Sequence, residues 1–200
     1  MARYTGPTNK LFRNYGVKDL SNRKLTSSMR QSASGQHGAV RKKLSEYAIH
    51  LNEKQKIRMT YLVSEKQFAK YYHEAARRKG VTGTILLQIL ESRLDNVLFR
   101  AGFGVTRKQT RQIVNHGHVL VNGKKVDIPS YLVKAGDVVA VKVKSSDFVK
   151  TVMSAIDLSC APAWVTVDAA ALTITFDRVP SREELDPDFK EQLVIEYYSK

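Results

Sequence analysis

The feature that most constrains the fold is an Asn-Gly pair between two short runs of residues that suit β-strands. Asn122-Gly123 follows residues 119–121 (Val-Leu-Val) and precedes residues 124–126 (Lys-Lys-Val). Both central residues of the tightest hairpin turn need a positive φ angle, which Asn and Gly tolerate best. We therefore predict a β-hairpin here. Gly136-Asp137 then leads into residues 138–141 (Val-Val-Ala-Val), a further predicted strand.

Two short helices are expected ahead of the hairpin. In residues 93–101, Leu94, Val97, Leu98 and Ala101 fall within one arc at helical spacing, as in a helix that faces a core. Gly102 and Gly104 then interrupt the chain.

The second helix has recognisable ends. Thr106, with Gln109 three residues on, matches a capping box, and Gly117 is placed as a C-terminal cap. Between them, Ile113 and Val114 share the apolar face of the helix.

Cationic and polar side chains occupy the other faces of these elements. Taken singly, such residues are often a solvated helix face. Because they come from adjacent elements, we expect them to form one surface that suits a phosphate backbone. The major groove of an A-form helix is too narrow for side chains to read, so recognition should rely on the shape of a folded RNA. The predicted RNA contacts here are Arg93, Arg100, Arg107, Lys108, Arg111, His116, His118, Asn122, Lys124 and Lys125.

The charge of the chain is large and unevenly placed. The net charge is +14; residues 1–150 hold 29 Lys+Arg against 10 Asp+Glu, giving +19, and residues 151–200 hold 4 against 9, giving −5. A basic body suggests a polyanionic partner, and the acidic end suggests contact with protein instead. No stretch approaches the roughly 20 apolar residues of a membrane-spanning helix, so we expect no membrane partner.

Several motifs closely resemble a known RNA-binding module. Residues 91–97 (ESRLDNV), 106–114 (TRKQTRQIV), 115–118 (NHGH), 121–123 (VNG) and 129–131 (PSY) are similar to the S4 RNA-binding module, which also occurs in RNA-modifying enzymes and some synthetases. The flanking sequences extend the resemblance over essentially the whole chain, to the bacterial-type S4 family of small-subunit ribosomal proteins. They are residues 2–7 (ARYTGP), 35–38 (GQHG), 44–47 (LSEY), 53–56 (EKQK), 67–68 (QF) and 191–200 (EQLVIEYYSK).

The resemblance implies an α+β fold in three parts. Residues 1–43 would be a basic, largely irregular N-terminal extension. Residues 44–91 would form a helical body, which residues 144–200 complete with strands and short helices. Residues 92–143 would be the inserted RNA-binding module, two helices packed on a short hairpin sheet.

Local patterns fill in these parts. Residues 64–80 predict a helix whose aromatic arc is core, with base stacking as the alternative. Residues 148–152 and 181–184 predict short helices. The runs 164–167, 172–176 and 193–198 predict strands.

The resemblance also implies a function. The chain would be a structural constituent of the small ribosomal subunit that binds 16S rRNA directly and nucleates assembly of the subunit body. It would influence translational accuracy together with two neighbouring small-subunit ribosomal proteins, the fifth-numbered and the twelfth-numbered. Some members also repress translation by binding a folded mRNA leader, which is the alternative function. A stand-alone RNA chaperone or a subunit of an RNA-modifying enzyme is a third hypothesis.

The N-terminal extension could be a disordered tail or a segment that orders on RNA. The resemblance favours the second and adds RNA contacts from Arg3, Tyr4, Lys10, Arg13, Gln36 and His37, and mRNA contacts from Arg41, Lys42 and Lys43 where mRNA enters the subunit.

Neither a zinc site nor another cofactor is expected. Many family members hold zinc here with four cysteines, but Asn9 and Phe12 stand where the first Cys-x-x-Cys would fall. The chain's one cysteine, Cys160, is predicted to be an inert buried thiol.

Nothing in the sequence predicts catalysis. Asp95 and Asp127 lie among basic residues and are expected to pair with them, and His116 and His118 have no carboxylate or nucleophile spaced to assist them. Gly102-Phe103-Gly104 lacks the remainder of a nucleotide-binding loop. With no apolar leader and no cysteine pair, we expect a ribosome-bound protein of the bacterial cytoplasm or the plastid stroma.

Overall fold

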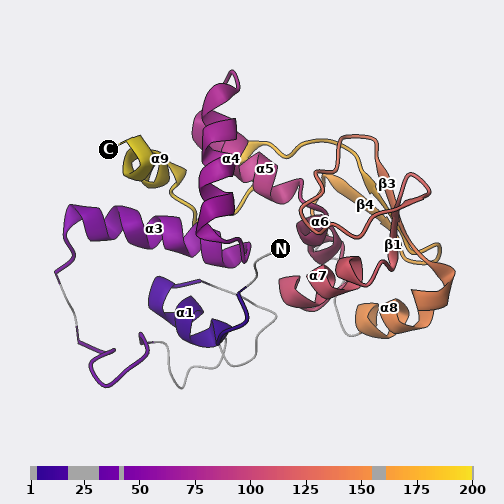
Figure 1. The fold of residues 1–200 in the computed structure, drawn as a ribbon, viewed down its shortest axis with the longest axis horizontal. Helices are drawn as coiled ribbons and strands as arrows, with labels where there is room; N and C mark the ends of the chain where they lie inside the picture. Colours follow the sequence, from indigo (N-terminus) through magenta and orange to yellow (C-terminus); the bar gives the residue numbers. More distant parts are fainter. Residues whose placement is uncertain (1–3, 18–31, 41–42, 155–160, 200) are drawn as a thin grey trace. The chain divides into compact units, whose positions relative to one another are not determined.

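The computed structural model describes residues 4–17, 32–40, 43–154 and 161–199, and these form two compact units. One unit is made by Met1–Leu86 with Asp186–Lys200, and the other by Leu87–Leu185. The described residues contain eight α-helices and one antiparallel sheet of five strands, which confirms the α+β class (Figure 1). Arg3, Arg41, Lys42 and Cys160, which carry predictions above, lie outside the described residues.

The first unit is helical. α3 packs against α1 on one side and against α9 on the other. The side chain of Ser45 caps α3 by accepting a hydrogen bond from the backbone N–H of Ala48, at 3.3 Å. The helices are α1 (Thr8–Tyr15), α3 (Glu46–Thr60), α4 (Glu65–Arg77) and α9 (Glu191–Ser199), and α5 (Thr82–Glu91) crosses the boundary between the units.

Part of the N-terminal extension that we expected to be irregular forms α1. Phe12 and Val17 are buried against Met59 and Leu62 at the end of α3. Gly16 ends the helix with φ at 65°, a left-handed conformation that glycine adopts without strain. This short apolar contact was too sparse to appear as helical periodicity in the sequence.

The aromatic arc of α4 is core, as predicted. Phe68 and Ala75 are fully buried and Tyr71 nearly so. Tyr72, on the same helix, stacks on Tyr198 of α9 with ring centroids 4.6 Å apart. These rings pack within the first unit, so the structure does not support the alternative that they stack on RNA bases.

The prediction of a strand at residues 193–198 is wrong, because this run forms α9. Its β-branched and aromatic residues favour a strand locally. In the folded chain Val194 is fully buried and Tyr198 packs on α4, so one helical face covers the neighbouring helices. Tertiary packing has overridden the local propensity.

The second unit contains the predicted hairpin. Asn122 and Gly123 have φ angles of 49° and 77°, and the hairpin strands pair Leu120 with Lys125 and Val121 with Lys124. The antiparallel strand order is β2-β1-β3-β5-β4. The elements are α6 (Leu94–Arg100), α7 (Arg107–Asn115), β1 (Val119–Val121), β2 (Lys124–Lys125), β3 (Val138–Val141), α8 (Ser146–Met153), β4 (Val165–Asp168) and β5 (Thr173–Phe176).

The two later strands were predicted correctly but assigned to the wrong part of the chain. We expected residues 144–200 to complete the helical body, yet β5 pairs with β3, with Val139 opposite Ile174. The hairpin alone would leave β3 with an unpaired edge, and β5 covers it. Ile174 and Phe176 are fully buried in the core that β1, β3, α6 and α7 share. Only Asp186–Lys200 group with the helical unit.

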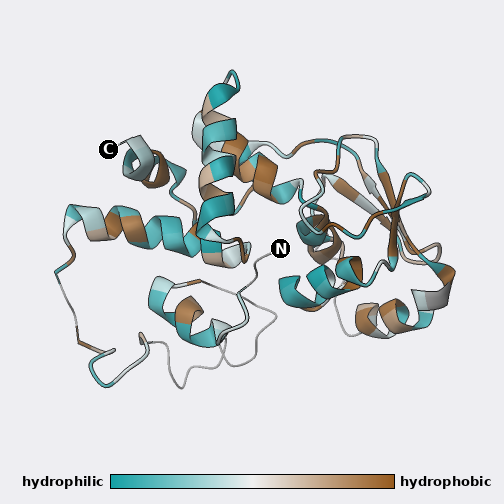
Figure 2. Cartoon of the chain, in the orientation of Figure 1, coloured by the Kyte–Doolittle hydropathy of each residue, from teal (hydrophilic) through white to brown (hydrophobic). Residues whose placement is uncertain are grey.

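The hydropathy of the helices differs between α5 and α7. Figure 2 shows hydrophobic colours along α5 and hydrophilic colours over most of α7. In α7 the buried residues are Thr110, Ile113 and Val114, so a single narrow face meets the core. The remaining faces of α7 are therefore available for polar contacts.

Glu65 joins three helices of the first unit. From the start of α4 its carboxylate accepts hydrogen bonds from Lys54 Nζ and from the Tyr198 hydroxyl, both at 2.8 Å, and lies 3.3 Å from Arg58 Nε. Burial alone would raise the pKa of Glu65, but the hydrogen bonds from Lys54 and Tyr198 and the two positive charges outweigh it, so the pKa lies below its ordinary value near 4.5.

We predict that Glu65→Gln destabilises the protein at neutral pH by about 1–2 kcal/mol, because it leaves the buried Lys54 ammonium without its carboxylate. The folded pKa is depressed, so this stabilisation is complete above pH 5 and is lost as pH falls through the folded pKa. Thermal unfolding at pH 7 and below pH 4 should show the gap between variant and wild type closing in acid. Glu46→Gln, an exposed acid in the first turn of α3, is the matched control; an equal loss there would contradict the assignment.

Candidate nucleic-acid interface

α7 presents its polar face because both its ends are fixed by local contacts. The Thr106 side chain accepts from the N–H of Gln109, and the Gln109 side chain accepts from the N–H of Val105. At the other end Gly117 has φ at 69°, and the N–H of His118 returns to the carbonyl of Ile113 at 3.3 Å. The predicted N-cap and C-cap are both confirmed.

A buried carboxylate lies beneath the arginines of α6 and α7. Arg93 donates to Asp95 from Nε to Oδ1 at 3.0 Å and from Nη2 to Oδ2 at 2.7 Å. Arg111 donates to the same Oδ2 from Nε at 2.9 Å and from Nη2 at 2.6 Å. Asp95 is the predicted partner of basic residues, but it is buried rather than at the surface.

A second buried carboxylate organises the other two arginines. Glu91 accepts from Arg100 Nε at 3.1 Å and Nη2 at 2.6 Å, and from the amide of Asn96 at 2.5 Å. The side-chain oxygen Oδ1 of Asn96 in turn accepts from Arg107 Nε at 2.9 Å. The Arg107 guanidinium also lies 4.2 Å from the ring centroid of Phe99, a cation–π contact. We call the set of Glu91, Arg93, Asp95, Asn96, Arg100, Arg107 and Arg111 the arginine network.

The network corrects one expectation. Arg93 was expected on an exposed polar face with Arg100. Its side chain is instead 3% exposed and donates hydrogen bonds to both carboxylate oxygens of Asp95. The side chains of Arg100 and Arg111 are 27% and 14% exposed. The arginines were therefore predicted on the correct elements, but Arg93 is too deep to reach the surface that the sequence predicts to contact RNA.

Most of the remaining basic residues lie around the C-terminal end of α7, and Lys108 lies in its first turn. The rings of His116 and His118 are 5.8 Å apart, and His118 Nδ1 lies 2.7 Å from Ser145 Oγ. Lys125 lies directly over Gly117, where an added Cβ would be 2.5 Å from its Cε. Lys108 and Lys124 are exposed as well. These residues continue the polar face of α7 onto the hairpin.

Asn122 is occupied by the turn itself. Its amide nitrogen donates to Asp137 Oδ1 at 2.8 Å, and its amide oxygen accepts from the N–H of Val138 at 2.9 Å. The structure gives this side chain a role in holding β1 and β3 together, and contact with RNA stays a prediction.

The N-terminal residues predicted to bind RNA belong to the first unit. Arg13 donates to the carbonyl oxygens of Ser32 and Ala33, so it links these two residues to α1. The hydroxyl of Tyr4 donates to Pro7 O at 3.3 Å. The side chains of Tyr4, Lys10, Gln36, His37 and Lys43 are exposed.

Sequence reasoning missed Glu91, Asn96 and Phe99 as members of the site. Glu91 carried a detectable signal, since it is an acid at the end of the apolar run 85–90, where a charge needs a buried partner. The roles of Asn96 and Phe99 depend on how α6 meets α7, which no local pattern indicates.

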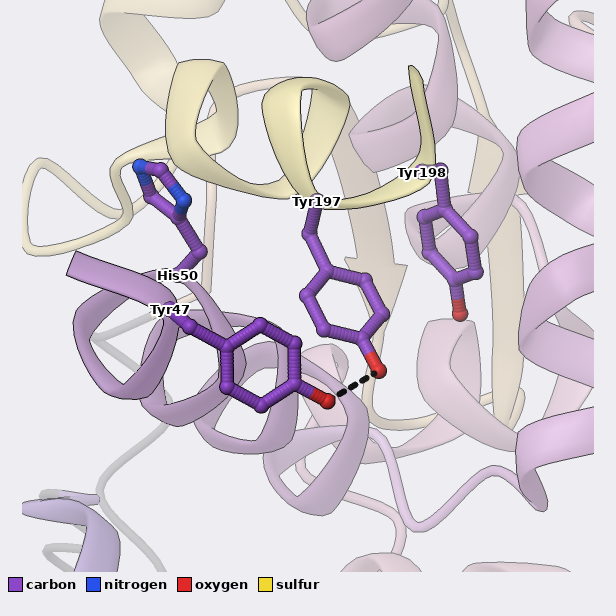
Figure 3. A pocket seen from close by; sticks show the side chains of 4 residues that line it. All are labelled: Tyr47, His50, Tyr197 and Tyr198. Carbon is purple, nitrogen blue, oxygen red and sulfur yellow. Dashed lines mark hydrogen bonds between the residues drawn. The ribbon is translucent and has the colours of Figure 1, made fainter. Parts of the chain in front are cut away.

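A pocket in the first unit was also missed. Tyr47 and His50 of α3 and Tyr197 and Tyr198 of α9 line a cavity of about 340 Å³ (Figure 3). The hydroxyls of Tyr47 and Tyr197 are 3.4 Å apart, and Tyr47 is 59% exposed. Lys54 Nζ lies 4.3 Å from the ring centroid of Tyr197.

The parts of the chain that the structure describes contain no cluster of three or more His, Cys, Asp or Glu side chains able to hold a metal ion. Among the same residues, no helix combines the length and the apolar run that crossing a bilayer requires.

Comparison with known proteins divides the chain between two family models. The ribosomal protein S4/S9 N-terminal domain matches residues 3–91, and the S4 domain matches residues 92–139.

Curated relatives match over their full lengths. The small ribosomal subunit protein uS4 of Laribacter hongkongensis is 53% identical, and uS4A of Symbiobacterium thermophilum is 50% identical. The uS4 protein of Mycoplasmopsis synoviae is 49% identical. In each case the alignment covers all of this chain and all of the relative.

Proposed function

The chain belongs to the uS4 family of small ribosomal subunit proteins, and from this we propose that it binds 16S rRNA directly and nucleates assembly of the subunit body. The family makes it a structural, non-enzymatic constituent of the small subunit with an S4 RNA-binding domain, and that membership implies binding to ribosomal RNA.

The observation that carries the proposal is the arginine network. It combines four guanidinium groups with two carboxylates on α5, α6 and α7, so its net charge is positive, and exposed lysines extend it along α7 and the hairpin. A phosphate backbone is attracted by such a surface, and each neutralised phosphate releases counterions. Arg107, Lys108 and Arg111 are the proposed central contacts, and Arg93 supports them from below.

The proposed site has further members around this centre. Arg100, His116, His118, Lys124 and Lys125 would contact phosphates and riboses at its rim. In the first unit, Lys10, Arg13, Gln36 and His37, with Arg3 and Tyr4, would contact rRNA, and Arg41, Lys42 and Lys43 would contact incoming mRNA.

We also propose protein partners, namely the fifth-numbered and, further, the twelfth-numbered small-subunit proteins, through which the chain would influence translational accuracy. Tyr47 is exposed and its ring lies 5.7 Å from that of Tyr197 between centroids, which supports a protein contact at α3 and α9, since aromatic side chains are enriched at such interfaces. The proposed location is the ribosome, in the bacterial cytoplasm or the plastid stroma.

Replacing both Arg107 and Arg111 with Ala should weaken binding to the 5′ region of small-subunit rRNA. The slope of log K against log salt should fall in magnitude by about 1–2, because each phosphate contact contributes about one. Filter binding from 50 to 300 mM salt measures this. Arg77→Ala with Arg78→Ala, an exposed pair on α4 bonded to Glu74, is the matched control. An unchanged slope in the α7 variant would count against this interface. Preferential binding of an mRNA leader over rRNA would favour translational repression instead.

We further propose that the fold needs no zinc, since the sequence holds a single cysteine. Elemental analysis of the purified protein should find less than stoichiometric zinc, and a chelator should leave the melting temperature unchanged. One zinc per chain would overturn this.

A further inference from the structure

Two acidic side chains lie beneath the arginines of the proposed RNA interface. The side chain of Glu91 is fully buried and that of Asp95 is 3% exposed. Asp95 accepts hydrogen bonds from Arg111, and Glu91 accepts them from Arg100. Glu91 is also bonded to Asn96, which holds Arg107. For a surface that attracts phosphate, buried negative charge at this position needs a physical explanation.

Asp95 is held rigidly by three segments. Its backbone N–H donates to Pro129 O at 3.1 Å, and its carbonyl accepts from Thr110 Oγ1 at 2.8 Å, which ties it to α7. Its carboxylate accepts two hydrogen bonds from Arg93 and two from Arg111. The planar fork of Arg111 is consequently fixed in direction as well as in place.

Glu91 acts one step further away on Arg107. Because the Asn96 amide nitrogen donates to Glu91, the Asn96 oxygen must point the other way, toward Arg107 Nε. The ring of Phe99 also contacts the same guanidinium. In this way a buried carboxylate sets the orientation of an arginine that it does not touch.

A carboxylate under an arginine has two opposite effects on RNA binding. It lowers the net positive charge, which weakens attraction to any polyanion. It also immobilises the guanidinium, which reduces the ordering cost on binding and favours only those phosphates that match its fixed position. Burying a charge destabilises the fold unless the charge is well paired. A site that bound RNA by its positive charge alone would therefore bind more tightly without these two acids.

We propose that Asp95 and Glu91 are positioning residues of the RNA interface: they lower affinity for RNA in general and raise discrimination in favour of the folded rRNA. They touch no RNA and act through Arg111 and through Asn96 and Arg107. This inference rests on the proposed function, because it concerns the same surface.

The test compares two RNAs, a transcript of the 5′ region of small-subunit rRNA and a shuffled transcript of equal length and composition. In Asp95→Asn, one acceptor oxygen becomes an NH2 donor and the negative charge is lost, so the side chain can no longer hold the guanidinium groups of both Arg93 and Arg111, and the fork of Arg111 is loosened. The preference for the folded transcript should fall about tenfold, the size of one charge-assisted hydrogen bond. Affinity for the shuffled transcript should stay level or rise, because the protein gains one positive charge.

Asp127→Asn is the matched control. Asp127 is exposed in the same unit, forms no ion pair with the described residues, and loses the same charge. This variant should keep the wild-type preference. A loss of folding in Asp95→Asn would weaken binding to both transcripts in equal proportion, so the ratio of the two affinities separates positioning from stability.

Arg111→Lys provides a second test, which leaves the Asp95 side chain itself unchanged. Lysine keeps the charge at a side chain that is partly exposed, but it cannot form the two-bonded fork with Asp95. The preference of the Arg111→Lys variant for the folded transcript should also fall about tenfold. Arg178→Lys, at an exposed ion pair with Glu184, should leave that preference unchanged.

The outcomes distinguish the two levels of inference. A wild-type protein that binds both transcripts equally overturns the proposed function and the positioning role together. A wild-type preference that Asp95→Asn and Arg111→Lys leave intact overturns the positioning role alone. Tighter binding of both transcripts by Asp95→Asn at an unchanged ratio does the same.

Discussion

The structure of the second unit depends on buried carboxylates that are shared among arginines. A charge removed from water must be paired and hydrogen-bonded, or it destabilises the fold by several kcal/mol. Asp95 meets this condition with two guanidinium groups, and Glu91 meets it with Arg100 and Asn96. No buried side-chain nitrogen or oxygen lacks a partner among the described residues. The mutual arrangement of α6 and α7 is therefore specified by polar geometry as well as by the apolar core beneath it.

Features set by neighbouring residues could be predicted from the sequence. The Asn122-Gly123 turn, the Thr106 cap and the Gly117 cap each depend on a few local dihedral angles and hydrogen bonds. Features set by distant partners could not. The run 193–198 has strand composition but becomes α9 because α3 and α4 offer it a helical packing site. β5 was recognised as a strand, yet its partner β3 lies more than thirty residues earlier, so its place in the sheet was assigned wrongly.

The candidate site shows the same division. Helical spacing and charge placed Arg107 and Arg111 on one face, and that inference needs only the period of a helix. Arg93 pairs with Asp95, whose backbone N–H is bonded to the carbonyl of Pro129 in a distant loop, and spacing does not encode that contact. A cation in a sequence therefore indicates where a charge lies along the chain. Whether it faces solvent or a buried acid is decided by contacts between elements.

The position of α9 has a consequence for the order in which the protein can be completed during synthesis. α9 packs on α3, and its residues follow the whole of the second unit in the sequence. All of Leu87–Leu185 has been polymerised before that helix exists. The first unit therefore stays incomplete, with the α9-binding side of α3 uncovered, after every strand of the second unit has been made.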